Sequence, residues 1–249
     1  MLASCVPAPK IYFIGDCDGY RYAITEFMPG ITLRDFLLNH CDDEDLSSIM
    51  YDCGKMLASI ASHVFQAPGF FDRNLQVKKI ATLDDYQNFI TQSLQHPNVT
   101  QQFKPSEIHE IAQLIARHAD SFPDAQAKNL VHGDYDPANI LVIKQDGRWQ
   151  ISAVLDFEFA FSGSWLWDVS NMLRYAHNMP ADFETSFLQG ITDCGFTLPR
   201  DWRVTLHLLN LASLLECFTR ASWEEKPNQF RDICDLLDYI MSQLKEAKS

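Results

Sequence analysis

The hydrophobic pattern divides the chain into a short β-rich beginning and a long helical remainder. Residues 10–14 (KIYFI) and 20–26 (YRYAITE) are rich in β-branched and aromatic side chains, which is typical of strands. The segment GDCDG between them offers glycine and aspartate for a tight turn. We therefore predict an antiparallel hairpin at the start of the chain.

Most of the later chain has apolar residues at helical spacing. Thr32 follows a Pro-Gly break and can cap a short helix, because its hydroxyl accepts a hydrogen bond from an amide of the first turn. Apolar side chains then recur every three or four residues, at Leu46, Ile49, Met50, Cys53, Leu57, Ile60 and Val64. Further helices are predicted at residues 83–94, 106–118, 166–176, 182–189, 202–219 and 230–245.

One β-rich segment interrupts the helices. Residues 140–143 and 149–155 read as strands, and the sequence QDG between them suits a hairpin turn. The stretch that enters this hairpin, NLVHGDYDPANILVI at 129–143, places four polar side chains, His132, Asp134, Asp136 and Asn139, within eight residues. Such polarity beside a buried strand indicates a functional loop.

Composition limits the class of protein. The chain has 249 residues, of which 47% are hydrophobic, so it can bury a sizeable core. A formal charge of −13 disfavours nucleic acid and anionic lipid as partners and favours cationic ligands. No two of the seven cysteines form a C-x-x-C pair. No apolar run is long enough to span a membrane, and the N-terminus lacks the pattern of a secretion signal. The cytoplasm is the expected location.

The polar loop has the residue types that phosphoryl transfer requires. One carboxylate must orient the attacking hydroxyl, while an amide oxygen and a second carboxylate hold Mg²⁺ against the phosphates. His132, Asp134 and Asn139 fit the pattern H-x-D-x-x-x-x-N, and Asp156 follows at the exit of the hairpin.

The motifs VHGDYDPANILV and VLDFEFAFSGSWLWDVSNMLRY, in this order, resemble the aminoglycoside phosphotransferase and choline kinase family. The segment YAITEFMPGITL is similar to the last strand of the N-lobe and the hinge of that family. The resemblance implies an α+β, protein-kinase-like fold. Residues 1–28 would be a truncated, β-rich remnant of the N-lobe, and residues 29–249 a mainly helical C-lobe carrying the inserted hairpin.

The resemblance assigns chemical roles to three residues. Asp134 would be the catalytic base that aligns the acceptor hydroxyl with the terminal phosphate. Asn139 and Asp156 would be ligands of Mg²⁺. ATP, or GTP, would be the phosphate donor.

Other positions would support the site. The backbones of Glu26 and Met28 would face the adenine at the hinge. His132 would orient the loop through hydrogen bonds rather than take part in the chemistry, and Asp168 would anchor the loop from the helix behind it. Two further acidic residues need no catalytic role: Asp136 can shape a turn before Pro137, and Glu158 can be solvated.

Two departures from the protein kinases narrow the interpretation. Gly133 stands where they have arginine, and no A-P-E segment follows, so a protein substrate is not expected. The chain also has no glycine-rich phosphate loop, no V-A-I-K-like strand and no G-x-x-x-x-G-K-[ST] motif. We therefore expect that the front of the N-lobe is missing and that Mg²⁺ neutralises most of the phosphate charge.

The predicted function is ATP-dependent phosphorylation of a hydroxyl on a small molecule. Family and charge favour an aminoglycoside or another amine, since the segment after Asp156 is rich in acidic residues: Asp168, Asp182, Glu184, Asp193, Asp201, Glu216, Glu224 and Glu225. A catalytically silent ligand-binding relative is the main alternative, and a metal-dependent hydrolase using His132, Asp134 and Asp156 is a weaker one. The sequence leaves the acceptor and the oligomeric state open.

Overall fold

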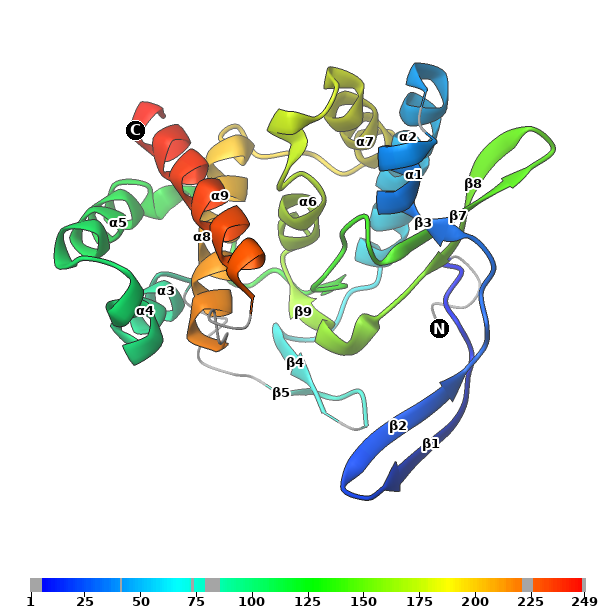
Figure 1. The fold of residues 1–249 in the computed structure, drawn as a ribbon, viewed down its shortest axis with the longest axis horizontal. Coiled ribbons are helices and arrows are strands. Elements are labelled where there is room, and N and C mark those ends of the chain that lie inside the picture. The colour runs from blue at the N-terminus through cyan, green and yellow to red at the C-terminus, as the bar shows by residue number, and fades with distance from the viewer. Residues whose placement is uncertain (1–5, 41, 73, 79–85, 221–225, 248–249) are drawn as a thin grey trace. The chain divides into compact units, whose positions relative to one another are not determined.

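The computed structural model describes residues 6–40, 42–72, 74–78, 86–220 and 226–247. It is an α+β protein with small sheets and many helices, as predicted (Figure 1). The chain forms two compact units, each assembled from distant parts of the sequence. Unit 1 comprises Met1–Val64, Leu130–Ala160 and Asn171–Thr197, and unit 2 comprises Phe65–Asn129, Phe161–Ser170 and Leu198–Ser249. The division into lobes at residue 28 stays a prediction.

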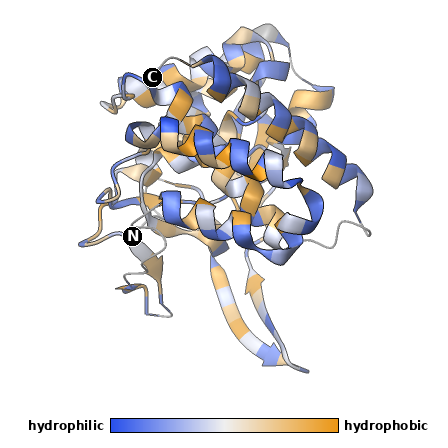
Figure 2. Ribbon diagram, turned by 90° about the vertical axis from the view of Figure 1, so that its left-hand side faces the viewer, coloured by the Kyte–Doolittle hydropathy of each residue, from blue (hydrophilic) through white to orange (hydrophobic). Residues whose placement is uncertain are grey.

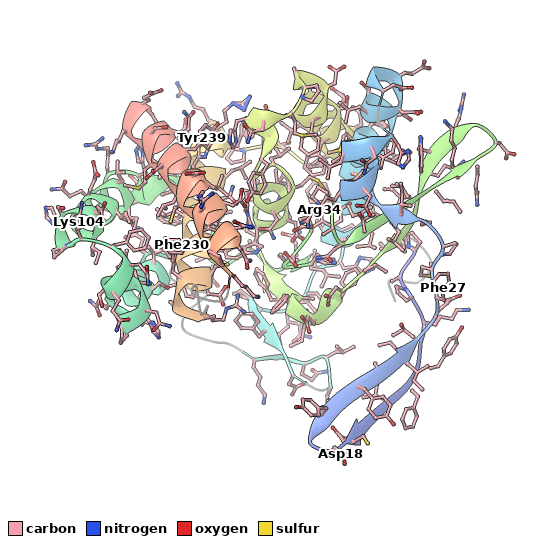
Figure 3. All side chains as sticks on the ribbon, viewed as in Figure 1. Asp18, Phe27, Arg34, Lys104, Phe230 and Tyr239 are labelled. Atoms are coloured by element: carbon pink, nitrogen blue, oxygen red, sulfur yellow. The ribbon has the colours of Figure 1, made fainter. Side chains whose placement is uncertain are left out.

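The predicted hairpin at the start of the chain is confirmed. Strands β1 (Ile11–Cys17) and β2 (Tyr20–Thr25) pair antiparallel. Asp18 and Gly19 form the turn with positive φ angles of 52° and 82°, and Figure 3 places Asp18 at its tip. A two-residue turn of this kind matches the twist of the strands, which lets β1 run further than the sequence pattern indicated. Apolar segments occur along both strands (Figure 2).

A three-stranded sheet in unit 1 has the order β3-β7-β8. Strand β3 (Ile31–Thr32) pairs antiparallel with β7 (Ile140–Gln145), which pairs antiparallel with β8 (Arg148–Val154). The β7–β8 turn is the predicted one, and Asp146 and Gly147 have φ angles of 51° and 81°. The second hairpin thus extends from the polar loop to the residues that precede Asp156.

Two predicted helices follow β3 in unit 1. Helix α1 (Leu33–Asn39) begins at Thr32, whose hydroxyl accepts a hydrogen bond from the Asp35 amide at 3.0 Å. Helix α2 (Asp43–Ala61) buries one apolar face and ends before Val64, which is exposed. The predicted cap at Thr32 is therefore confirmed. The apolar pattern predicted that the next helix would continue to Val64, whereas α2 ends at Ala61.

Helix α7 (Ala181–Asp193) packs closely against α2. A Cβ atom on Gly54 would collide with the carbonyl oxygen of Phe187, and one on Gly190 would collide with that of Tyr51. The hydroxyl of Tyr51 also donates a hydrogen bond to Asp193 Oδ2 at 2.9 Å. Glycine on both helices allows the two backbones to approach closely.

Unit 2 is mainly helical around an apolar core. Its helices are α3 (Tyr86–Gln95), α4 (Pro97–Gln102), α5 (Pro105–Arg117), α8 (Trp202–Arg220) and α9 (Pro227–Glu246). All but α4 lie where the sequence predicts helices; the start of the predicted helix 83–94 lies outside the described residues. Leucine and isoleucine side chains of α3, α5, α8 and α9 meet in one cluster.

Short elements connect the helices. Helix α6 (Leu166–Met172) crosses from unit 2 into unit 1. The remaining strands of the described residues are β4 (Gly69–Phe71), β5 (Val77–Lys78), β6 (Asn129–Val131) and β9 (Phe161–Gly163). Short 3₁₀ turns occur there at Ala119–Ser121, Phe157–Phe159 and Ala176–Asn178. Across the described ranges of the chain, no helix has the length and hydrophobicity needed to cross a membrane.

Candidate active site

The polar loop, residues 132–139, connects β6 to β7 within unit 1, and both of its ends bond to Leu155. The carbonyl oxygen of Leu155 lies 2.7 Å from His132 Nε2. The amide of Leu155 donates to the carbonyl oxygen of Asn139 at 2.8 Å. Since Asp156 is the next residue, these bonds bring its backbone close to the loop.

His132 is fully buried and its hydrogen bonds define its tautomer. Its Nδ1 accepts a hydrogen bond from the Asp134 amide at 3.2 Å, so the proton lies on Nε2, which donates to Leu155. Burial lowers the pKa of His132, although its bond to Leu155 opposes the shift. The ring also packs against Phe157, with centroids 4.4 Å apart. A neutral ring with both nitrogens engaged is suited to holding the loop in place.

Asp134 lies half-buried in the middle of the loop. Burial raises the pKa of its carboxyl above the ordinary value, and repulsion from the negative charge of Asp136 acts in the same direction. A hydrogen bond from Asn139 and the positive charge of Arg174 oppose this rise. The raised pKa moves the carboxylate towards the basicity of a proton acceptor.

Asn139 bonds directly to Asp134. Its Nδ2 donates to the backbone oxygen and to Oδ2 of Asp134, both at 2.9 Å. Its Oδ1 makes no hydrogen bond within the described part of the chain. The donor end of the amide is thus occupied, while the oxygen is left for a ligand.

Asp156 has a left-handed backbone, with φ and ψ both 63°, and an exposed side chain. Aspartate tolerates this conformation better than most residues do. Among the residues that the structure describes, its carboxylate makes no hydrogen bond or ion pair, and none of these residues form a group of three or more His, Cys, Asp or Glu side chains that could hold a metal ion. Asn139 and Asp156 fit Mg²⁺, which commonly takes one or two protein oxygens together with substrate phosphates.

Gly133 allows the loop to pass close to the turn that follows Asp156. Its φ angle is +89°, and a Cβ atom would collide with the carbonyl oxygen of Phe159. Its own carbonyl oxygen accepts a hydrogen bond from Asn171 Nδ2 at 3.0 Å. The glycine in the HGD motif is therefore required by the backbone.

The second half of the loop is a turn attached to helix α1. Asp136 Oδ1 accepts a hydrogen bond from the Ala138 amide at 2.6 Å, which agrees with the turn-forming role expected of Asp136. The carbonyl oxygen of Pro137 accepts from the Arg34 amide at 2.9 Å. Arg34, labelled in Figure 3, also brings its exposed guanidinium to 3.9 Å from Asp136.

The hinge segment runs from β2 to β3. The Glu26 amide donates to the carbonyl oxygen of Lys10 at 2.8 Å, which continues the β1–β2 ladder. The Met28 amide has no hydrogen-bond partner within the described ranges, and the Phe27 side chain between them is 90% exposed (Figure 3). Ser152 Oγ donates to the Pro29 carbonyl oxygen at 2.6 Å, so the hinge is attached to β8. Adenine recognition by Glu26 and Met28 stays a prediction.

Asp168 is fully buried in α6 and belongs to unit 2, whereas the loop belongs to unit 1. Its anchoring of the loop therefore stays a prediction. Glu158 is exposed, as expected of a solvated side chain. Glu224 and Glu225 lie outside the described residues.

Sequence reasoning missed two residues that bond to the site. Asn171 binds Gly133, and Arg174 Nη2 donates to Asn171 Oδ1 at 2.6 Å. Both belong to the segment DVSNMLR, in which the sequence analysis gave a supporting role to Asp168 alone. The spacing of Asn171 and Arg174 on one predicted helix was the available signal, but Gly133 is 38 residues away from Asn171 in the chain.

A protein-family model matches most of the chain. Residues 1–205 match the model of a family described as "Phosphotransferase enzyme family". None of the curated proteins compared with the chain matches it.

Solved structures share the fold at low identity. A proposed aminoglycoside phosphotransferase from Ralstonia eutropha has a TM-score of 0.74 at 18% identity, over 100% of this chain and 81% of that one. The ternary complex of a thermostable mutant of aminoglycoside phosphotransferase APH(4)-Ia with ADP and hygromycin B has a TM-score of 0.69 at 18% identity, over 98% and 79%. The GDP and kanamycin complex of APH(2")-IIIa has a TM-score of 0.60 at 14% identity, over 98% and 77%. The protein-kinase-like fold predicted from the sequence is confirmed.

Proposed function

Because this chain belongs to the phosphotransferase enzyme family, we propose that it transfers the terminal phosphoryl group of ATP, or GTP, to a hydroxyl of a small molecule. One observation carries the proposal: Asn139 donates to the Asp134 carboxylate at 2.9 Å, and the Asn139 carbonyl bonds to the residue before Asp156. These bonds support the proposal because they link the proposed base to one proposed metal ligand and to the residue next to the other.

Asp134 is the proposed catalytic base. Its carboxylate accepts a hydrogen bond from the acceptor hydroxyl and takes the proton as the hydroxyl oxygen bonds to the terminal phosphorus. The bond from that phosphorus to the bridging oxygen breaks, and the nucleoside diphosphate leaves. The burial that raises the pKa of Asp134 supports this role, because a base works best when its pKa lies near the working pH.

Asn139 Oδ1 and Asp156 are the proposed ligands of Mg²⁺. Both oxygens are free of other described partners, and Asp156 is exposed. The bound ion supplies positive charge that neutralises the phosphates. The bonds of His132 and Asn139 to Leu155 keep Asp156 beside the loop, so they would orient both proposed ligands towards the ion.

The nucleotide base is proposed to bind along the hinge. The Met28 amide, which has no partner among the described residues, can donate to a ring nitrogen, and the bond from Ser152 to Pro29 keeps this segment next to β8. Related structures contain ADP or GDP, which supports a purine nucleotide donor without selecting between ATP and GTP.

An aminoglycoside or another amine is the proposed acceptor. The APH(4)-Ia complex contains hygromycin B and the APH(2")-IIIa complex contains kanamycin. The formal charge of −13 supports a cationic acceptor, since it attracts amines over long range.

A transfer assay tests the proposal. The purified chain is incubated with Mg²⁺, ATP or GTP, and single acceptors including aminoglycosides, other amines and neutral polyols, and products are detected by mass spectrometry. A phosphorylated acceptor that forms only with nucleotide supports the proposal. Nucleotide binding without transfer to any acceptor would favour the silent binding protein, and hydrolysis without nucleotide would favour the metal-dependent hydrolase.

A further inference from the structure

The peptide group between Gly133 and Asp134 is held at both ends. Its carbonyl oxygen accepts a hydrogen bond from Asn171 Nδ2 at 3.0 Å. Its N–H donates to His132 Nδ1 at 3.2 Å. Two side chains from different segments of unit 1 therefore determine the plane of the peptide that immediately precedes the proposed base.

Asn171 is well suited to this task. Its side chain is buried, with 4% of the residue exposed, and both ends of its amide are bonded. A guanidinium can only donate and a backbone carbonyl can only accept, so Oδ1 must face Arg174 and Nδ2 must face Gly133. The orientation of the amide is thus fixed by its partners.

Arg174 adds charge to this arrangement. Its Nη2 donates to Asn171 Oδ1 at 2.6 Å, and the Arg174 amide bonds to the Asn171 carbonyl oxygen at 3.4 Å in the turn after α6. A hydrogen bond from a charged donor is stronger than a neutral one and polarises the amide that accepts it. The Asn171 Nδ2 group therefore becomes a better donor to Gly133.

Gly133 has a backbone conformation that benefits from such support. Its φ angle of +89° is open to glycine, and the missing side chain leaves the backbone free to rotate once the peptide is released. Rotation of this peptide would turn the Asp134 carboxylate away from its place beside Asn139. A displacement of about 1 Å can cost about 100-fold in rate.

We infer that Asn171 and Arg174 are positioning residues for phosphoryl transfer: Arg174 orients Asn171, and Asn171 holds the Gly133–Asp134 peptide so that the Asp134 carboxylate meets the acceptor hydroxyl. The inference rests on the proposed function. It adds two residues that, within the described part of the chain, form no hydrogen bond or ion pair with the proposed metal ligands or the hinge. Their loss should therefore affect turnover more than nucleotide binding.

Steady-state kinetics tests whether Arg174 orients Asn171 and whether Asn171 positions Asp134. Asn171→Ala and Arg174→Met should each lower kcat by about 10- to 100-fold, with the KM for ATP unchanged within about twofold. Because Arg174 acts on the peptide through Asn171, while its charge also acts directly on the Asp134 carboxylate, the double variant should lose clearly less than the product of the two single losses. Arg174→Lys keeps a charged donor and should restore part of kcat. A loss of kcat in the double variant equal to the product of the two single losses would overturn the inference that Arg174 acts through Asn171. A loss of nucleotide affinity as large as the loss of kcat would overturn the positioning role.

Hydrogen–deuterium exchange tests, without relying on activity, whether Asn171 and Arg174 hold the Gly133–Asp134 peptide in place. Amides of residues 132–139 should exchange faster in both variants than in the parent protein, while α8 and α9 should be unaffected. Arg220→Met, which removes an arginine paired with Glu216 on α8, is the matched control and should leave the loop unchanged. Unchanged exchange in Asn171→Ala would overturn the inference. If the parent protein transfers no phosphate but the variants show the expected exchange pattern, the proposed function and the catalytic part of the inference would be refuted. The structural role of Asn171 and Arg174 in holding the Gly133–Asp134 peptide would then stand.

Discussion

Asn139 donates its side-chain amide to the Asp134 carboxylate at 2.9 Å, across one turn of the loop that joins β6 to β7. The bond orients two groups at once, because the amide that faces Asp134 must turn its oxygen away from it. The same pair therefore presents a proton acceptor and a free amide oxygen. This relationship connects the proposed base to the proposed metal site.

The raised pKa of Asp134 predicts that its carboxylate lowers the stability of the fold at neutral pH. A carboxyl whose pKa is higher in the folded chain than in the unfolded chain contributes its full stability below the unfolded pKa, and this contribution is lost as pH rises through the folded pKa. Asp134→Asn, measured by thermal unfolding without nucleotide or metal, should thus raise Tm relative to the parent protein near neutral pH. The difference should shrink as pH falls towards the ordinary value of 3.8.

The exposed residue Asp16 on β1 provides a control, since Asp16→Asn should show a much smaller effect. A Tm for Asp134→Asn below that of the parent at neutral pH would contradict the proposed effect of burial on Asp134.

Asp156 should act through the metal. Asp156→Ala should weaken binding of the Mg·ATP complex by about tenfold, equivalent to about 1.4 kcal/mol, as measured by calorimetry. Glu158→Ala is the matched control, because Glu158 is an exposed carboxylate only two residues away. Equal affinities in the two variants would remove Asp156 from the metal site.

Gly133→Ala should destabilise the protein more than a simple change at a left-handed glycine does. Gly147→Ala provides the comparison, since Gly147 has a φ angle of +81° but an added Cβ would meet nothing within 4 Å. Strain alone costs about 1–3 kcal/mol, and Gly133→Ala adds the collision with Phe159. Chemical denaturation of both variants measures the difference, and equal losses of stability would show that the contact with Phe159 is unimportant.

A cationic acceptor should respond to salt. The KM for amine acceptors should rise with ionic strength, because the Debye length falls from about 10 Å at 0.1 M to about 3 Å at 1 M. The KM for a neutral acceptor should stay nearly constant. Efficient turnover of neutral polyols with amines ignored would remove the amine proposal and leave the phosphotransferase assignment intact.

The sequence predicted those features that depend on local chemistry. Both hairpin turns contain Asp-Gly, which supplies the positive φ angles that such turns need, and the Thr32 cap follows from its hydroxyl. Helix α4 was missed because six residues carry too short a pattern. The spacing of Asp134 and Asn139 placed both in one loop, where the structure shows them hydrogen-bonded, while their chemical roles stay predictions.

Features that depend on distant contacts could not be predicted. The bonds from Leu155 to both ends of the loop use backbone groups, which leave no mark on the residue type. The left-handed conformation of Asp156 is equally invisible in the sequence, since aspartate adopts several conformations. The pairing of Asn171 with Gly133 requires the helix to fold onto the loop first.

The most direct test of the account compares transfer by the parent protein with transfer by Asp134→Asn. With Mg·ATP and an acceptor found in the screen, the substitution should lower kcat by about 10²- to 10⁴-fold, because it removes the negative proton acceptor and keeps the shape of the side chain. The affinity for Mg·ATP, measured by calorimetry, should be nearly unchanged. Transfer at the parent rate, or a loss of nucleotide affinity as large as the loss of turnover, would contradict the role of Asp134 as the base.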